Sequence, residues 1–231
     1  VVFPNIAIKK EEIVYQFSGV RPLEYSGAKT TGQISRDHSI RILSGVWTGQ
    51  NYPIYSLVGG KWTSFRAFAE EVTDKALAFL EKERIRNTKE LAIGGGRGYE
   101  RRESERRKQL DGITAWTDIK IQRLEVLYER YGTRVEEIAM FISQGEDQLL
   151  KELPSYSQRE IGFLITREKV IHLDDLILRR THIAKLGLLT HPLLKELNEV
   201  AASFLGWDIA QKAAEIQRAM QILEDKHNIR L

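Results

Sequence analysis

The spacing of apolar residues divides the chain into a mixed first third and a helical remainder. Short apolar runs bounded by turn residues, namely FSGVRPL, SIRIL and PIYSLV, predict strands within residues 1–62. Apolar residues then recur on one helical face from Thr63 to Lys82, which predicts a single continuous helix. From about residue 113 onward every apolar pattern has helical spacing, and we expect five or six helices there.

Residues with capping chemistry mark where several of these helices begin and end. The segments Thr133–Glu136 and Ser157–Glu160 each have the spacing of a capping box, so both predict a helix start. Thr190 suits the start of the next helix and Gly206 suits its end. Asp208 suits the start of the last helix.

These patterns predict an α+β chain in three parts. Residues 1–83 hold short strands and one long helix, and residues 113–231 form an all-α domain. Residues 84–112 between them contain GGGRG and the charged run ERRESERRKQ, a composition typical of a linker.

Composition excludes several classes of protein. The 231 residues include 35 Lys and Arg against 32 Asp and Glu, a net charge of +3 without a basic stripe, so we expect no nucleic-acid partner. The absence of cysteine excludes disulfides and thiolate metal sites, and it fits a reducing compartment. No apolar run approaches the roughly 20 residues needed to span a bilayer. The first residues, VVFPNIAIKKEE, are not typical of a signal peptide and lack an initiator Met, so we expect a piece of a longer protein.

The stretch SLVGGKWTSF places two glycines and a lysine between a predicted strand and a predicted helix. The first N–H groups of a helix have no internal partner, and the helix dipole makes that end positive. Gly59 and Gly60 permit close approach of a ligand to the backbone, Lys61 adds positive charge, and Thr63 can cap the helix. This pattern favours a site for an electron-rich or anionic group. The alternative is an ordinary strand-to-helix turn with a solvated lysine.

Two arginines lie in predicted strand-like contexts before this turn. Arg21 occurs in SGVRPL and Arg36 in ISRDH. A guanidinium group binds two oxygens of a phosphate or carboxylate at once, so both arginines and Lys61 can converge on a small phosphorylated substrate. The alternative is that each arginine is a surface charge. For His38 we favour a structural hydrogen bond over acid–base chemistry.

The motifs SGVRPL, ISRDH and GGKWTSFRAFAEE resemble, in order and spacing, those of FAD-dependent glycerol-3-phosphate dehydrogenases and the related oxidases. The resemblance continues through LYERYGTRVEEI, HLDDLILRRTHIA and LGWDIAQKAAEI, so it covers nearly the whole chain. It implies oxidation of sn-glycerol 3-phosphate to dihydroxyacetone phosphate, with electrons passed from FAD to quinone, or to oxygen in the oxidases. It also implies a cytoplasmic enzyme that can sit peripherally on the inner face of the membrane.

The resemblance also implies roles for individual residues. Arg21, Arg36 and Lys61 would bind the substrate, with one arginine on the phosphate and the other on the oxygen at the reacting carbon; which does which is open. The turn that would meet the pyrimidine edge of the flavin consists of Gly59, Gly60, Lys61, Trp62 and Thr63. Core packing is the alternative role for Trp62.

The G-x-G-x-x-G turn that binds the FAD pyrophosphate has no counterpart here. IGGGRGYE has no third glycine in register, and we interpret it as a flexible loop. We therefore expect residues 1–83 to be the C-terminal part of an FAD- and substrate-binding domain whose first half precedes residue 1. The chain alone would then bind FAD weakly or not at all and be inactive, and we predict no catalytic residue in it.

Three further expectations concern partners. The scattered histidines lack ligand spacing, so we predict no metal site. The run RGYERRESERRKQ can touch acidic lipid headgroups, but its interleaved glutamates favour a solvated linker or helix. A helical protein-interaction module without catalysis is the alternative to a flavoenzyme.

Overall fold

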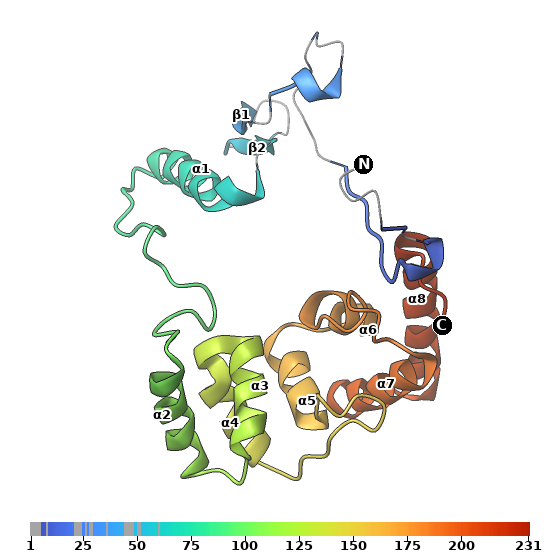
Figure 1. The fold of residues 1–231 in the computed structure, drawn as a ribbon. Coiled ribbons are helices and arrows are strands. Elements are labelled where there is room, and N and C mark those ends of the chain that lie inside the picture. The colour runs from blue at the N-terminus through green and yellow to red at the C-terminus, as the bar shows by residue number, and fades with distance from the viewer. Residues whose placement is uncertain are drawn as a thin grey trace. The chain divides into compact units, whose positions relative to one another are not determined.

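The computed structural model describes residues 6, 7, 9–20, 25, 27, 30–35, 37–43, 49, 52–59 and 61–231, with only the backbone described at 31 and 62. The chain forms two compact units (Figure 1). The strand–helix unit consists of Gly19–Ala92, and the helical unit consists of Val1–Ser18 together with Ile93–Leu231.

The strand–helix unit contains a two-stranded antiparallel sheet followed by a helix. Strand β1 (Ser39–Leu43) pairs with β2 (Ile54–Val58). A 3-10 turn, η4 (Trp62–Ser64), leads into helix α1 (Phe65–Phe79), and another 3-10 turn, η2 (Thr31–Gln33), precedes the sheet. The hydroxyl of Tyr55 on β2 donates to the carbonyl of Lys75 on α1 at 3.0 Å, which ties the sheet to the helix.

Two of the three predicted strands are confirmed in this unit. SIRIL forms β1, and PIYSLV contains β2. In the third, Phe17–Val20 form no strand, and residues 21–23 lie outside the described residues. Helix α1 has 15 residues and lies within the range expected to be helical. Together with the helical unit this gives a largely helical chain with a small sheet, in agreement with the α+β class.

The helical unit surrounds one apolar core. Its elements are η1 (Lys10–Glu12), α2 (Glu103–Thr114), α3 (Ile121–Tyr131), η5 (Gly132–Arg134), α4 (Val135–Ser143), α5 (Gln158–Arg167), α6 (Leu173–Asp175), the π-helix η6 (Leu176–Arg180), α7 (His191–Leu205) and α8 (Ile209–His227). Helix α5 packs against α4 and α7, and α7 packs against α8 (Figure 1). Leu124, Ile138, Ile161 and Leu197 are fully buried in this core.

The N-terminal residues of the helical unit lie beside the end of α8 (Figure 1). The ring of Tyr15 stacks on that of His227, with 4.7 Å between ring centroids. The backbone N–H of Gln16 donates to the carbonyl of His227 at 3.3 Å, and a ring nitrogen of His227 lies 3.0 Å from the carbonyl oxygen of Gln16. Residues from the two ends of the chain therefore fold into one unit.

Three of the four predicted helix starts are confirmed by their caps. The side chains of Ser157, Thr190 and Asp208 each accept a hydrogen bond from the backbone N–H three residues further on, and Gly206 ends α7 in the left-handed conformation. The prediction at Thr133 is wrong, because α4 begins only at Val135 and has no side-chain cap.

The glycine segment expected to be a flexible loop is packed into the helical unit. The hydroxyl of Thr133 donates to the carbonyl oxygens of Gly95 and Arg97 instead of capping a helix, and its N–H donates to Gly95 at 3.0 Å. A Cβ at Gly95 would lie 2.0 Å from the carbonyl oxygen of Tyr131, and φ at Gly95 is 72°. Only glycine fits there, because the two backbones touch.

The structure also differs from the linker expected over residues 84–112. The guanidinium group of Arg84 lies 2.9 Å from the Glu70 carboxylate and 2.7 Å from that of Asp74, both on α1. Further along, α2 buries Leu110 and Ile113 in the core of the helical unit. The composition of this segment is typical of a linker, but its first residues contact α1 and its last residues pack into the core of the helical unit.

Substitution of Gly95 tests this close approach. Gly95→Ala should lower the free energy of unfolding of the helical unit by at least ~2 kcal/mol, because the added Cβ strains the backbone and collides with Tyr131. Gly112→Ala is the matched control, since Gly112 lies in α2 with open space around it, and it should stabilise the unit by about 0.5–1 kcal/mol. Urea denaturation followed by circular dichroism measures both, and equal stability of the two variants would contradict the packing described.

Candidate functional site

The glycine turn after β2 is present as a strand-to-helix elbow. Gly59 follows the last residue of β2 and has φ of 76°, and a Cβ there would lie 2.8 Å from the carbonyl oxygen of Asp37. The backbone of the turn thus lies directly against the residues that precede β1, at a separation that only glycine permits. We call residues 59–64 the elbow.

Neither helical start in the elbow carries a side-chain cap. Lys61 precedes η4 and Ser64 precedes α1, and neither side chain accepts a hydrogen bond from the helix. The cap expected from Thr63 is therefore absent. The first amides of a helix carry partial positive charge when no side chain satisfies them, so the elbow can face an electron-rich group.

The cation of the elbow is accessible. The ammonium of Lys61 lies 3.7 Å from a carboxylate oxygen of Asp37, and the two side chains are 54% and 86% exposed. An exposed pair at this distance contributes little, so Lys61 can exchange Asp37 for a ligand at small cost. The structure brings Gly59, Lys61 and Asp37 together.

Several predicted site residues lie outside the described part of the molecule. These are Arg21, Arg36 and Gly60, together with the side chain of Trp62. His38, close to Arg36 in sequence, has a structural environment: its Nε2 lies 3.2 Å from a carboxylate oxygen of Glu71, and its ring stacks on Phe68 at 4.3 Å. This pairing joins the start of β1 to α1, in line with the hydrogen-bonding role favoured for His38.

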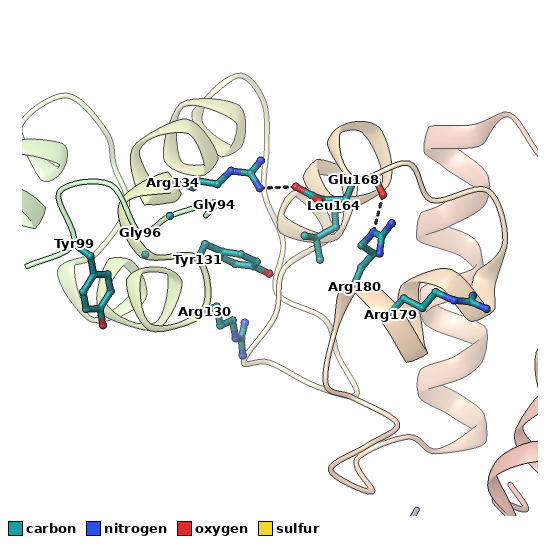
Figure 2. A pocket seen from close by; sticks show the side chains of 12 residues that line it. Gly94, Gly96, Tyr99, Arg130, Tyr131, Arg134, Leu164, Glu168, Arg179 and Arg180 are labelled. Carbon is teal, nitrogen blue, oxygen red and sulfur yellow. Dashed lines mark hydrogen bonds and ion pairs between the residues drawn. The ribbon is translucent and has the colours of Figure 1, made fainter. Parts of the chain in front are cut away.

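A second candidate site, not predicted from the sequence, lies in the helical unit. A cavity of about 580 Å³ lies between the α3–α4 corner and the segment that runs from α5 to η6. Figure 2 shows the side chains that line it. We call it the arginine cavity. Its charged and aromatic lining consists of Tyr99, Arg130, Tyr131, Arg134, Glu168, Arg179 and Arg180. The glycines of the packed loop, Gly94–Gly96, complete its wall.

Arg130 and Tyr131 line the arginine cavity, where we call them its floor, and both belong to a buried ionic network centred on Glu160. This carboxylate is fully buried and accepts hydrogen bonds from Arg123, from Arg130 at 2.9 Å and from the hydroxyl of Tyr131 at 2.8 Å. The guanidinium group of Arg130 also lies 3.6 Å from the ring centroid of Tyr156. A buried carboxylate is tolerated only when it is paired and hydrogen-bonded in this way, so the network is a structural node.

The described residues offer neither an unpaired basic patch on α2, nor a metal site, nor a membrane-spanning helix. The cations of α2 pair with carboxylates: Arg107 lies 3.2 Å from Asp111 and 2.8 Å from Glu125, and Lys108 lies 3.0 Å from Glu105. Within the described ranges, no three His, Asp or Glu side chains gather closely enough to hold a metal ion. Among the described helices, none has the length and apolar character needed to cross a bilayer.

Comparison with known proteins identifies the family. Residues 86–212 match the model of the C-terminal domain of alpha-glycerophosphate oxidase, which is more than half of the chain. The chain therefore belongs to this family of the glycerol-3-phosphate oxidases and dehydrogenases, which confirms the resemblance noted from the motifs.

Curated relatives extend the similarity over most of the chain. A glycerol-3-phosphate dehydrogenase of Mycobacterium leprae is 25% identical over 83% of this chain and 32% of its own length. A mitochondrial glycerol-3-phosphate dehydrogenase of Arabidopsis thaliana is 25% identical over 95% of this chain and 36% of its own length. An aerobic glycerol-3-phosphate dehydrogenase of Staphylococcus aureus is 28% identical over 78% of this chain and 32% of its own length. The chain thus spans about a third of the length of these relatives.

Alkaline titration tests the network at Glu160. Burial of the hydroxyl, together with the nearby Glu160 carboxylate, raises the pKa of Tyr131 above its ordinary value. The same phenol ionises near pH ~10 in the unfolded chain, so its contribution to stability is complete below that pH and is lost above it, by up to ~1.4 kcal/mol per pH unit. Tyr131→Phe should remove this contribution to the fall of the unfolding free energy with rising pH, which we call the slope.

The matched control for this titration is Tyr99→Phe. Tyr99 also belongs to the helical unit, but its side chain is 44% exposed. Urea denaturation at a series of pH values measures all three proteins, and Tyr99→Phe should keep the wild-type slope. A wild-type slope in Tyr131→Phe would show that Tyr131 ionises normally in the folded protein.

Proposed function

We propose that this chain is part of an FAD-dependent flavoenzyme that oxidises sn-glycerol 3-phosphate to dihydroxyacetone phosphate and passes the electrons to quinone. The observation that carries the proposal is the match to this family over residues 86–212, with relatives named glycerol-3-phosphate dehydrogenases. The similarity to the Arabidopsis protein covers 95% of the chain, so it extends through both units and includes the elbow.

The described residues of the elbow fit one edge of a flavin ring. Gly59 holds the turn against the backbone of Asp37, and the uncapped starts of η4 and α1 leave helix amides available to a planar group. The chemistry that FAD supplies when bound is acceptance of a hydride, which leaves negative charge on the pyrimidine edge of the ring. Lys61 and the positive helix end would stabilise that charge, with Gly60, Trp62 and Thr63 completing the contact.

The substrate would be held by Arg21, Arg36 and Lys61. A guanidinium fork matches the oxygens of a phosphate, so one arginine would hold the phosphate and the other the oxygen at the reacting carbon. The weak, exposed pairing of Lys61 with Asp37 supports this assignment, because it leaves the ammonium available to a substrate oxygen. Orientation of the alcohol carbon toward the hydride acceptor is the contribution of this chain to the reaction.

The electron acceptor distinguishes the two members of the family. The names of the relatives favour a dehydrogenase, for which we propose quinone as the acceptor, and the description of the family model names an oxidase. A quinone acceptor implies a cytoplasmic protein with peripheral contact to the inner face of the membrane. The paired charges on α2 give such contact little electrostatic support.

Substitution of the two arginines tests the substrate site. In the proposed flavoenzyme, Arg21→Ala and Arg36→Ala should each lower kcat/KM by about 3 kcal/mol of transition-state stabilisation, roughly a hundredfold, because each removes a charged substrate ligand. Arg86→Ala is the control, since Arg86 is exposed and lies outside the elbow, and its activity should stay at the wild-type level. Wild-type kinetics from either test variant would remove that arginine from the site.

Flavin absorbance of the purified 231-residue chain tests whether the chain can bind FAD without a G-x-G-x-x-G turn. No G-x-G-x-x-G turn for the FAD pyrophosphate occurs in the sequence, so the chain should be colourless and without turnover. A stoichiometric yellow protein would contradict the inference that this part of the cofactor site lies elsewhere. For the proposed flavoenzyme, reduction of a quinone analogue without oxygen uptake on addition of glycerol 3-phosphate is expected, and rapid oxygen uptake would identify an oxidase instead.

A further inference from the structure

The arginine cavity of the helical unit carries an excess of positive charge. Its lining includes the guanidinium groups of Arg130, Arg134, Arg179 and Arg180 against the single carboxylate of Glu168. Burial of like charges around one space is unfavourable unless counter-charges compensate them. The partners of each arginine therefore decide whether its charge is neutralised within the protein or is available to an anionic ligand.

Three of the four arginines have carboxylate partners. Arg134 lies 2.5 Å from Glu168 and 3.2 Å from Glu137. Arg179 lies 2.9 Å from Asp174 and 2.6 Å from Asp175, and in Figure 2 its side chain points away from Arg130 and Arg134. Arg130 must share the buried carboxylate of Glu160 with Arg123, so one negative charge there faces two positive charges.

Arg180 differs from the other three. Among the described residues, no carboxylate lies within ion-pair distance of its guanidinium group, which is half-buried. Its Nε donates to the backbone carbonyl of Glu168 at 2.6 Å, as Figure 2 shows, and its two terminal nitrogens donate to no described acceptor. A half-buried guanidinium fork with free donors is the group that binds phosphate and carboxylate oxygens most readily.

The position of Arg180 is fixed by the π-helix that ends with it. Both the N–H and the hydroxyl of Thr181 donate to the carbonyl of Leu176, at 3.0 and 2.9 Å, and so close the wide turn. Leu176 and Ile177 anchor this turn in the core, because both are fully buried. Such turns are uncommon and occur frequently at functional sites. The guanidinium group is therefore preorganised, which lowers the entropic cost of ligand binding.

The glycine loop supplies a second kind of donor on the wall of the same cavity. Gly94, Gly95 and Gly96 line it without side chains, and a Cβ at Gly94 would lie 4.0 Å from Cδ of Arg134. In the described part of the chain, the N–H groups of Gly94 and Gly95 donate to no acceptor. Thr133 holds this loop through the carbonyl of Gly95. Exposed backbone amides beside cations are a recurrent feature of phosphate sites.

We propose that the arginine cavity binds the phosphate group of a phosphate monoester, with Arg180 as its principal ligand. A dianion matches the unbalanced charge of Arg180 and of the Arg123–Arg130–Glu160 cluster, and its tetrahedral oxygens accept hydrogen bonds from several directions. The organic part of the ligand would lie against Leu164 and Tyr99, which also line the cavity. The ligand is either a small soluble phosphate monoester or the phosphomonoester headgroup of phosphatidic acid. The inference rests on the helical unit alone and does not depend on the proposed redox reaction.

Calorimetric titration of the 231-residue chain with inorganic phosphate tests the site. The wild type should bind phosphate, and Arg180→Gln should weaken binding at least tenfold, because it removes the unpaired cation. Arg167→Gln is the matched control, since Arg167 ends the neighbouring α5, is exposed and lies outside the cavity, and it should bind like the wild type. Circular dichroism establishes that each variant is folded.

A second variant, Arg134→Gln, and a second ligand, succinate, extend this test. If Arg180→Gln does not fold, Arg134→Gln takes its place and should also weaken phosphate binding. Absence of binding to the wild type, or equal affinity in the wild type and both test variants, would overturn the proposal. Succinate titrated under the same conditions should bind more weakly than phosphate, and equal or tighter binding of succinate would overturn the assignment to a phosphate group.

Two measurements distinguish a lipid headgroup from a soluble phosphate monoester as the ligand. Co-sedimentation with phosphatidic acid vesicles that exceeds that with phosphatidylcholine vesicles, and that is lost in Arg180→Gln, would support a lipid headgroup. Binding of glycerol 3-phosphate and inorganic phosphate without vesicle binding would support a soluble ligand. Binding to neither vesicles nor soluble phosphates would exclude the site.

Discussion

The buried carboxylate of Glu160 is the interaction on which the helical unit depends. It lies in the first turn of α5, and it accepts hydrogen bonds from Arg130 and Tyr131 at the end of α3 and from Arg123 near the start of α3. Loss of one partner from such a network leaves an uncompensated buried charge, at a cost of roughly 3–5 kcal/mol. This ionic contact therefore fixes α3 against α5, and with it the floor of the arginine cavity.

Close backbone contacts provide the second constraint, and they recur in both units. In the strand–helix unit, Gly59 lies against the carbonyl of Asp37, so the elbow and the residues before β1 are held together. In the helical unit, Gly95 lies against Tyr131 and Gly132 at the corner between α3 and α4. In each case a side chain would occupy the space of the neighbouring backbone. Both candidate sites are thus built where glycine lets two backbone segments, far apart in the sequence, lie against each other.

The two units contribute different chemistry to one family. The strand–helix unit offers an elbow with uncapped amides and an accessible lysine, which suits the edge of an electron-rich ring. The helical unit, which contains most of the residues that match the family model, offers a cationic cavity whose charge is only partly balanced. The chain spans about a third of the length of its relatives, and in the proposed function the strand–helix unit is one wall of a larger site.

The sequence by itself determined the features that depend on neighbouring residues. The caps at Ser157, Thr190 and Asp208 need only an acceptor and an amide three residues apart, and strands β1 and β2 follow from short apolar runs between turn residues. The family was also evident from the order of its motifs. The elbow was predicted in position, although its cap at Thr63 was not observed and the two arginines of the site lie outside the described residues.

Only the tertiary structure decided which distant groups meet. Thr133 has the spacing of a helix cap, but its hydroxyl binds the carbonyl of Gly95, 38 residues away. The glycine run that resembled a linker is fixed by the same contact, and the pairing of Glu160 with Arg123 spans 37 residues. Arg180 stands apart from its arginine neighbours because no described carboxylate reaches it, which its place in LILRRTH does not reveal. Local patterns encode caps and periodicity, whereas burial and charge balance depend on partners that folding alone brings within a few ångströms.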